Sequence, residues 1–141
     1  MVEMKHQILI KGLPEKVYAA IATQAGLRGW WTADSTADEK AGGKAEFGFG
    51  KRATVFRMTI EKLDPGKHVA WICHGDDPEW KGTTLTWDLT RDGDGTILRF
   101  AHSNWQSASD YYAMCNSTWG ELMYRLKHYV EGRNPGPHWK E

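Results

Sequence analysis

Alternation of apolar and polar residues predicts a series of short β-strands along most of this chain. The clearest run is 83–91, where Leu85, Trp87 and Leu89 share one face and polar residues occupy the other. Turn residues such as Asp64-Pro65-Gly66 separate neighbouring runs, so the connections are short and the sheet should be antiparallel. The six or seven expected strands cover 6–11, 32–38, 44–49, 53–63, 67–74, 83–91 and 96–102.

Residues 13–32 follow the helical period instead. Pro14 suits the first position of a helix, where its missing N–H costs nothing, and apolar residues then recur three and four positions apart. Gly26 interrupts this pattern, and Trp30-Trp31 ends a second short helix. We therefore expect a two-helix corner after the first strand. Adjacent side chains on a helix diverge by about 100°, so one tryptophan should fill the core while the other lines a cavity mouth. The alternative is that both fill the cavity and leave the protein without a pocket.

A longer helix is predicted over residues 107–131. Ser107 and Asp110 form a capping-box pattern at its start, and Gly132 is a natural stop. Because the sequence offers no second long helix, its partner should be the inner face of the sheet. Its apolar residues repeat at spacings of three and four: Tyr112, Cys115, Trp119, Leu122, Leu126 and Tyr129.

These elements predict one α+β domain over residues 1–134, followed by a short tail over 135–141. The curved antiparallel sheet would wrap around the long C-terminal helix, and the two-helix corner would close one end. This arrangement leaves a space between the helix and the sheet.

Short motifs spread over the chain carry a family resemblance. They are Pro14-Glu15-Lys16-Val17-Tyr18, Ala20-Ile21, Trp30-Trp31, Gly42-Gly43, Ala45-Glu46-Phe47, Gly95-Thr96, Trp119 and the stretch from Glu131-Gly132 to Pro137. In this order they resemble the START-like superfamily, also called SRPBCC or birch-pollen-allergen-like. The closer resemblance is to its AHSA-like branch, named after the activator of the heat-shock-protein-90 ATPase. The resemblance implies a helix-grip fold with a cavity, and a link to the stress response, more firmly than it implies a reaction.

Composition narrows the class of function. Basic and acidic residues both number 18, so the chain lacks the net positive charge that attracts nucleic acid. Its apolar runs fall short of the roughly 20 residues that insertion into a membrane needs. The N-terminus has no signal-peptide layout, so we expect a cytoplasmic protein in which Cys73 and Cys115 are reduced, buried thiols.

Aromatic residues are the most promising ligand contacts. Eight tryptophans are more than a domain of 141 residues needs to fill its core, so some should line the cavity. Tyr112 and Asn116, on the first half of the long helix, would supply hydrogen bonds. Trp80 and Trp105, near strand ends, could act as lids or pack over those ends. The expected ligand-binding residues are Trp31, Phe47, Phe56, Met58, Trp71, Trp87, Phe100, His102, Trp105, Tyr112, Asn116 and Trp119.

His102 is a weak candidate for acid–base catalysis. It shares the inward face of its strand with Leu98 and Phe100, close to the predicted end of that strand. The alternative is a capped histidine at a strand terminus. The run from His74 to Glu79 collects carboxylates in one loop without a second cluster, so we expect a solvated acidic turn, no metal site and no cofactor.

Three functions fit these observations. The first is binding of a small hydrophobic or aromatic molecule, lipid-like or polyketide-like, between the sheet and the helix. The second is a cyclase or dehydratase that uses His102 on a bound carbonyl. The third, which the family resemblance implies, is a co-chaperone-like interaction module. We expect a monomer or weak dimer that binds a small hydrophobic ligand, with a chaperone as a candidate partner and with neither nucleic acid nor membrane insertion.

Overall fold

The computed structural model describes residues 1–75 and 77–141. Within them, seven antiparallel strands form one sheet in the order β1-β7-β6-β5-β4-β3-β2. The strands are β1 (Val2–Ile10), β2 (Asp34–Ala37), β3 (Lys44–Phe49), β4 (Thr54–Asp64), β5 (His68–His74), β6 (Thr84–Asp92) and β7 (Gly95–Trp105). The helices are α1 (Pro14–Ala22), α2 (Gln24–Trp30) and α3 (Asp110–Val130). The predicted α+β helix-grip architecture is confirmed.

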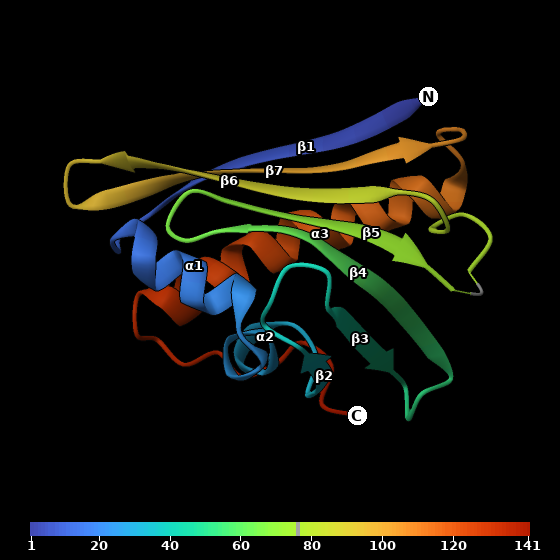
Figure 1. The fold of residues 1–141 in the computed structure, drawn as a ribbon, viewed down its shortest axis with the longest axis horizontal. Helices are drawn as coiled ribbons and strands as arrows, with labels where there is room; N and C mark the ends of the chain where they lie inside the picture. The colour runs from blue at the N-terminus through green and yellow to red at the C-terminus, as the bar shows by residue number, and fades with distance from the viewer. Residues whose placement is uncertain (76) are drawn as a thin grey trace.

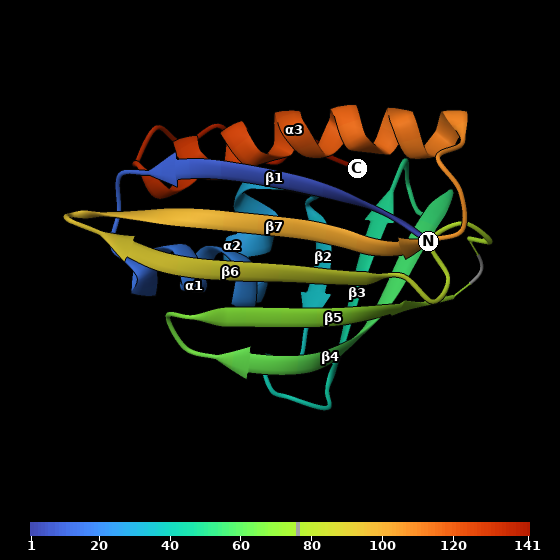
Figure 2. The ribbon, with the colours of Figure 1, turned by 90° about the horizontal axis from the view of Figure 1, so that it is seen from above.

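The sheet curves around α3. In Figure 1, β1, β7 and β6 run above this helix while β3 and β2 lie below it. Figure 2 shows the same helix running alongside the edge strand β1. The two-helix corner of α1 and α2 covers one end of the enclosed space, as the sequence predicts.

Side chains alternate in burial along the strands, as period-two patterning requires. On β6, Leu85, Trp87 and Leu89 are buried. On β5, where apolar residues occupy both faces in the sequence, Trp71 and Cys73 point into the core and Ile72 lies half-buried on the other face. The inner face of the sheet therefore combines aromatic rings such as Trp71 and Trp87 with aliphatic side chains such as Leu85 and Leu89.

The helical corner depends on a close approach between α1 and α2. A Cβ atom added to Gly26 would lie 2.5 Å from the carbonyl oxygen of Ala19, so only glycine fits there. The hydroxyl of Thr23 accepts a hydrogen bond from the backbone N–H of Gly26 at 3.0 Å and caps α2. Trp30 is fully buried against this corner, and its indole N–H donates to the carbonyl of Ala20 at 2.9 Å.

The segment after α3, which the sequence sets apart as a tail from residue 135, packs onto the domain. The N–H of Trp139 donates to the carbonyl of Trp31 at 3.0 Å, and the carbonyl of Trp139 accepts from the N–H of Ala33 at 2.8 Å. The guanidinium of Arg125 donates to the carbonyls of residues 135–137. These contacts fix the position of the Trp139 ring.

Three boundaries differ from the sequence prediction by three or more residues, at the start of β1, the end of β7 and the start of α3. Strand β1 begins at Val2 rather than at His6, because buried Met4 continues its inward face. Strand β7 continues to Trp105, three residues past His102. The predicted cap at Ser107 is wrong: Ser109 is the N-cap, with extended backbone and a hydroxyl that accepts from the N–H of Tyr112 at 3.1 Å.

We expect Ser109→Ala to lower the free energy of unfolding by about 1 kcal/mol, because it removes this cap. Ser107→Ala, two residues earlier on an exposed position, should change it by less than about 0.5 kcal/mol. Urea denaturation followed by circular dichroism measures both. A larger loss for Ser107→Ala than for Ser109→Ala would contradict the assigned start of α3.

Candidate functional site

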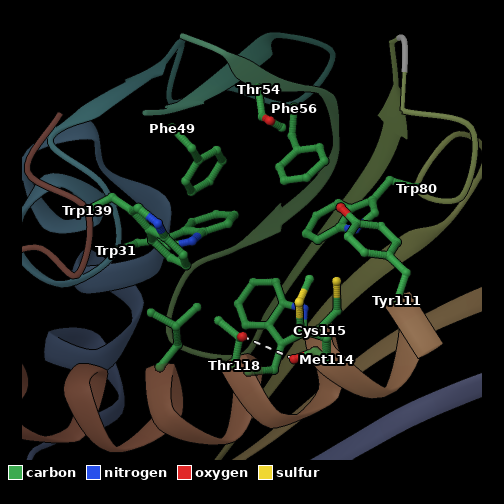
Figure 3. Close-up of a pocket in the computed structure, with 12 residues that line it drawn as sticks. Trp31, Phe49, Thr54, Phe56, Trp80, Tyr111, Met114, Cys115, Thr118 and Trp139 are labelled. Carbon is green, nitrogen blue, oxygen red and sulfur yellow. Dashed lines mark hydrogen bonds between the residues drawn. The ribbon is translucent and has the colours of Figure 1, made fainter. Parts of the chain in front are cut away.

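A pocket of ≈ 240 Å³ opens between α3 and the β3–β4 side of the sheet. Figure 3 shows Phe49 and Phe56 facing the helix across it, with Trp31 and Trp139 at one end and Trp80 at the other. The lining residues are Trp31, Phe49, Thr54, Phe56, Trp80, Tyr111, Met114, Cys115, Thr118, Trp119, Leu122 and Trp139.

One face of α3 forms the floor of this pocket. Its six lining residues are three or four positions apart, or adjacent across the stripe, which places them on one side of a helix. They are Tyr111, Met114, Cys115, Thr118, Trp119 and Leu122. Leu122, Trp119 and Cys115 are buried, whereas Met114 is 57% exposed and marks the rim.

The remaining walls are aromatic. The rings of Phe56 and Trp80 stack with centroids 3.8 Å apart and planes 9° from parallel. Phe49 meets Trp139 edge to face at 4.9 Å and 85°. The edge-to-face contact is a preferred arrangement for aromatic pairs, and the close stack of Phe56 on Trp80 joins β4 to the loop before β6.

Hydrogen bonds between the loop of Trp80 and the start of α3 hold Trp80 in place. One carboxylate oxygen of Asp77 accepts from the N–H groups of Glu79 and Trp80, at 2.9 and 3.0 Å. The other accepts from the hydroxyl of Tyr111 at 3.0 Å, and Ser109 donates to the carboxylate of Glu79 at 2.6 Å. The expected solvated turn is therefore a structural contact at Asp77 and Glu79, while Asp76 lies outside the described residues.

The pocket carries no ionised side chain among its described lining residues. Burial raises the pKa of the Tyr111 phenol, and the nearby Cys115 and Asp77 raise it further. Burial also raises the pKa of the Cys115 thiol, although the nearby polar groups of Trp80 and Tyr111 oppose the change. Both groups are neutral at pH 7, and both cysteines of the chain are free and buried.

Tyr112 and Asn116 lie on a neighbouring face of α3 and do not line the pocket. The hydroxyl of Tyr112 donates to the carbonyl of Glu3 at 2.9 Å. The amide oxygen of Asn116 lies 2.9 Å from Nε2 of His6. Both side chains thus join α3 to β1, which gives them a structural role in this arrangement.

His102 sits inside the core with both ring nitrogens engaged. The indole N–H of Trp119 donates to Nδ1 at 3.2 Å, so Nδ1 carries no proton. Nε2 therefore carries the proton and donates to the hydroxyl of Thr83 at 2.8 Å, which itself donates to the carbonyl of Trp80 at 2.6 Å. Burial lowers the pKa of His102 to about 3. A fully bonded, neutral imidazole suits a structural role better than acid–base catalysis near pH 7.

Three of the expected ligand-binding residues line the pocket: Trp31, Phe56 and Trp119. Trp31 lines the inner end of the pocket although it is buried, and Trp30 fills the core; their rings do not diverge but stack 6.0 Å apart with planes 15° from parallel. Trp105 packs edge-on against His102 and Tyr112. The other aromatic and apolar residues of the set lie in the buried core away from the pocket: Phe47, Met58, Trp71, Trp87 and Phe100.

The lining residues that the expected set lacks come from α3, from β3 and β4, and from two irregular segments. The missed residues on α3 lie three or four positions from one another or from Trp119, so the helical period could have identified them. Trp80 lies in a loop and Trp139 in the last segment, where no periodic signal exists. The added lining residues are Phe49, Thr54, Trp80, Tyr111, Met114, Cys115, Thr118, Leu122 and Trp139.

Comparison with known proteins now identifies the family. A family model described as activator of Hsp90 ATPase homolog 1-like protein matches residues 12–131. The chain belongs to this family. A comparison with curated protein sequences found no match.

Solved structures support the same assignment. The Aha1 dimer from Colwellia psychrerythraea is 36% identical, with a TM-score of 0.85 over 94% of this chain and 98% of that one. Protein MLL2253 from Mesorhizobium loti is 18% identical, with a TM-score of 0.81 over 94% and 98% of the two chains. CalU16 from Micromonospora echinospora is 17% identical, with a TM-score of 0.71 over 96% and 77%. The last two share the fold alone. Among the described residues, the helices of this family member are too short or too polar to cross a membrane.

The buried imidazole predicts a pH-dependent stability. An unfolded histidine has a pKa near 6.5 and His102 in the fold about 3, so only the unfolded chain binds this proton between those values. Above about pH 6.5 the neutral imidazole of His102 does not lower the free energy of unfolding. Below that pH, the free energy of unfolding falls by about 1.4 kcal/mol for each pH unit of acidification. Denaturant unfolding at pH 6.5, 5.5 and 4.5 measures the loss.

His102→Gln should remove this part of the pH dependence, while His74→Gln, at an exposed position, should retain it. In the unchanged protein, the ring-proton NMR signals of His102 should not titrate between pH 7 and pH 5. Titration of these signals near pH 6.5 would overturn the assignment, whether or not the variant folds.

Proposed function

We propose that this protein binds a small hydrophobic molecule in the pocket between α3 and the β3–β4 side of the sheet. The observation that carries the proposal is the pocket itself, an aromatic-walled space of ≈ 240 Å³. The neighbouring space between helix and sheet is filled by buried rings such as Trp71, Trp87 and Phe100. A hollow of this kind beside a dense core is typical of a ligand site.

Burial of apolar surface would supply the affinity. A ligand the size of an aromatic side chain buries roughly 150–250 Å², which is worth about 4–6 kcal/mol at ~25 cal/mol per Å² before the costs of binding. A gross gain of this size corresponds to dissociation constants between tens of micromolar and about 1 mM, so after the costs of binding we expect high-micromolar to millimolar affinities for unoptimised ligands.

The geometry favours binding over catalysis by His102. Its imidazole does not line the pocket, and Trp119 and Thr83 occupy its two nitrogens. A cyclase or dehydratase needs a group that can exchange a proton with the bound molecule. The enzyme hypothesis therefore ranks below ligand binding.

Two neutral probes of one skeleton test the proposed function: 2-naphthol and its saturated counterpart decahydro-2-naphthol. We expect at least one to shift the amide and indole NMR signals of Trp31, Trp80 and Trp119. Thr118→Phe should weaken that binding at least tenfold, because the added ring occupies the pocket. Ser117→Phe places the same ring one residue away, on an exposed position, and should bind as the unchanged protein does. Equal binding by both variants, or shifts clustered elsewhere, would contradict the proposal.

A chaperone partner is the second candidate function, and the family description, which names an activator of the Hsp90 ATPase, favours it. The Colwellia relative is described as a dimer, so self-association of this chain is a related expectation. Calorimetric titration with the isolated middle domain of an Hsp90 chaperone tests the partner. We expect a 1:1 complex that Thr118→Phe leaves intact, since its surface would be separate from the pocket. An absence of measurable heat at 100 µM of both proteins would rule this candidate out.

A further inference from the structure

We propose that the ligand of this pocket is an uncharged, flat aromatic molecule of two fused rings, and neither a lipid chain nor an organic acid. This inference rests on the proposed function and narrows it. Its basis is the combination of pocket size, ring geometry and the absence of ionised groups among the described lining residues.

Size limits the ligand. A protein cavity of about 150 Å³ lined by apolar side chains holds one benzene molecule. The present pocket, at ≈ 240 Å³, has roughly one and a half times that volume. Pockets for drug-sized ligands begin near 300 Å³. Two fused rings therefore match the available space, and a larger polycyclic molecule would extend past the rim at Met114.

The filled core beyond the pocket excludes a long chain. Trp31 stacks on Trp71 with planes 5° from parallel, and Trp71 meets Trp87 edge to face at 5.5 Å. Trp119 closes the same side, with its ring 4.4 Å from that of Phe100. These rings occupy the space through which an acyl chain would run along α3. The pocket is therefore short and ends at these rings.

The walls favour a flat ring over a saturated one. Phe56 and Trp80 are nearly parallel, whereas Phe49 and Trp139 are nearly perpendicular, so rings in more than one orientation line the site. Each well-placed ring pair is worth about two- to tenfold in affinity beyond surface burial. The thioether of Met114 adds a sulfur contact at the rim, where ring edges are favoured.

Charge excludes acids. Tyr111 and Cys115 are the ionisable lining residues, and burial keeps both neutral. The neighbouring charged groups held against α3 are the carboxylates of Asp77 and Glu79. A ligand carboxylate would lose its hydration without gaining a cation and would also be repelled by these groups.

Two matched pairs of probes test the inference by NMR titration of the unchanged protein at pH 7. The first pair, 2-naphthol and decahydro-2-naphthol, differs in planarity and aromaticity. We expect 2-naphthol to bind at least fivefold more tightly. The second pair, 2-naphthamide and 2-naphthoate, differs in charge, and we expect the amide to bind at least tenfold more tightly.

Phe49→Leu supplies the matched variant. It keeps an apolar side chain at a half-buried position but removes one ring from the wall. It should reduce the preference for 2-naphthol over decahydro-2-naphthol at least twofold, chiefly by weakening 2-naphthol.

The outcomes separate the two proposals. If decahydro-2-naphthol binds as tightly as 2-naphthol, or 2-naphthoate as tightly as the amide, the ligand class is wrong while the proposed function stands. If none of the four probes binds in the pocket, the proposed function falls together with the ligand class. An unchanged preference in a folded Phe49→Leu variant would also overturn the aromatic selectivity.

Discussion

Trp119 is the contact on which the arrangement of helix and sheet depends. Its ring lies against Trp31, Trp87 and Phe100, so a single side chain of α3 reaches the corner and two strands. Its indole N–H is satisfied by His102, which fixes the rotation of the helix as well as its distance from the sheet. Apolar packing alone would fix rotation poorly, because it has no direction. One directional bond inside an aromatic core thus sets which face of α3 borders the pocket.

That rotation explains why the fold was easier to predict than the site. Period-two alternation at Leu85, Trp87 and Leu89 has one reading, and the structure confirms it. Along the first half of α3, by contrast, Tyr111 and Tyr112 are adjacent and both amphipathic. Periodicity cannot tell which of them faces the sheet edge and which the pocket, since either position leaves a tyrosine half-buried. Hydrogen bonds to residues distant in sequence orient the two side chains, to Asp77 for Tyr111 and to Glu3 for Tyr112.

His102 shows the same limit in another form. Alternation predicts its inward orientation correctly, but its chemistry depends on Thr83 and Trp119, which are distant in sequence.

The dense packing also has a cost. The indole N–H groups of Trp80, Trp87 and Trp105 are buried and find no hydrogen-bond partner among the described residues. Each such group is worth about 1–3 kcal/mol of lost stability, which ring packing must offset. The core is therefore selected for shape more than for polar satisfaction.

The Trp139 wall lies outside the part of the chain that defines the family. The match ends at residue 131, yet the segment beyond it returns to Trp31 and brings one more ring to the pocket. Within this segment, only the side chain of Trp139 enters the lining, whereas the corner and α3 contact the backbone of the segment. A change of side chain at Trp139 would therefore reshape one end of the pocket, while the backbone contacts that hold this segment in place would remain.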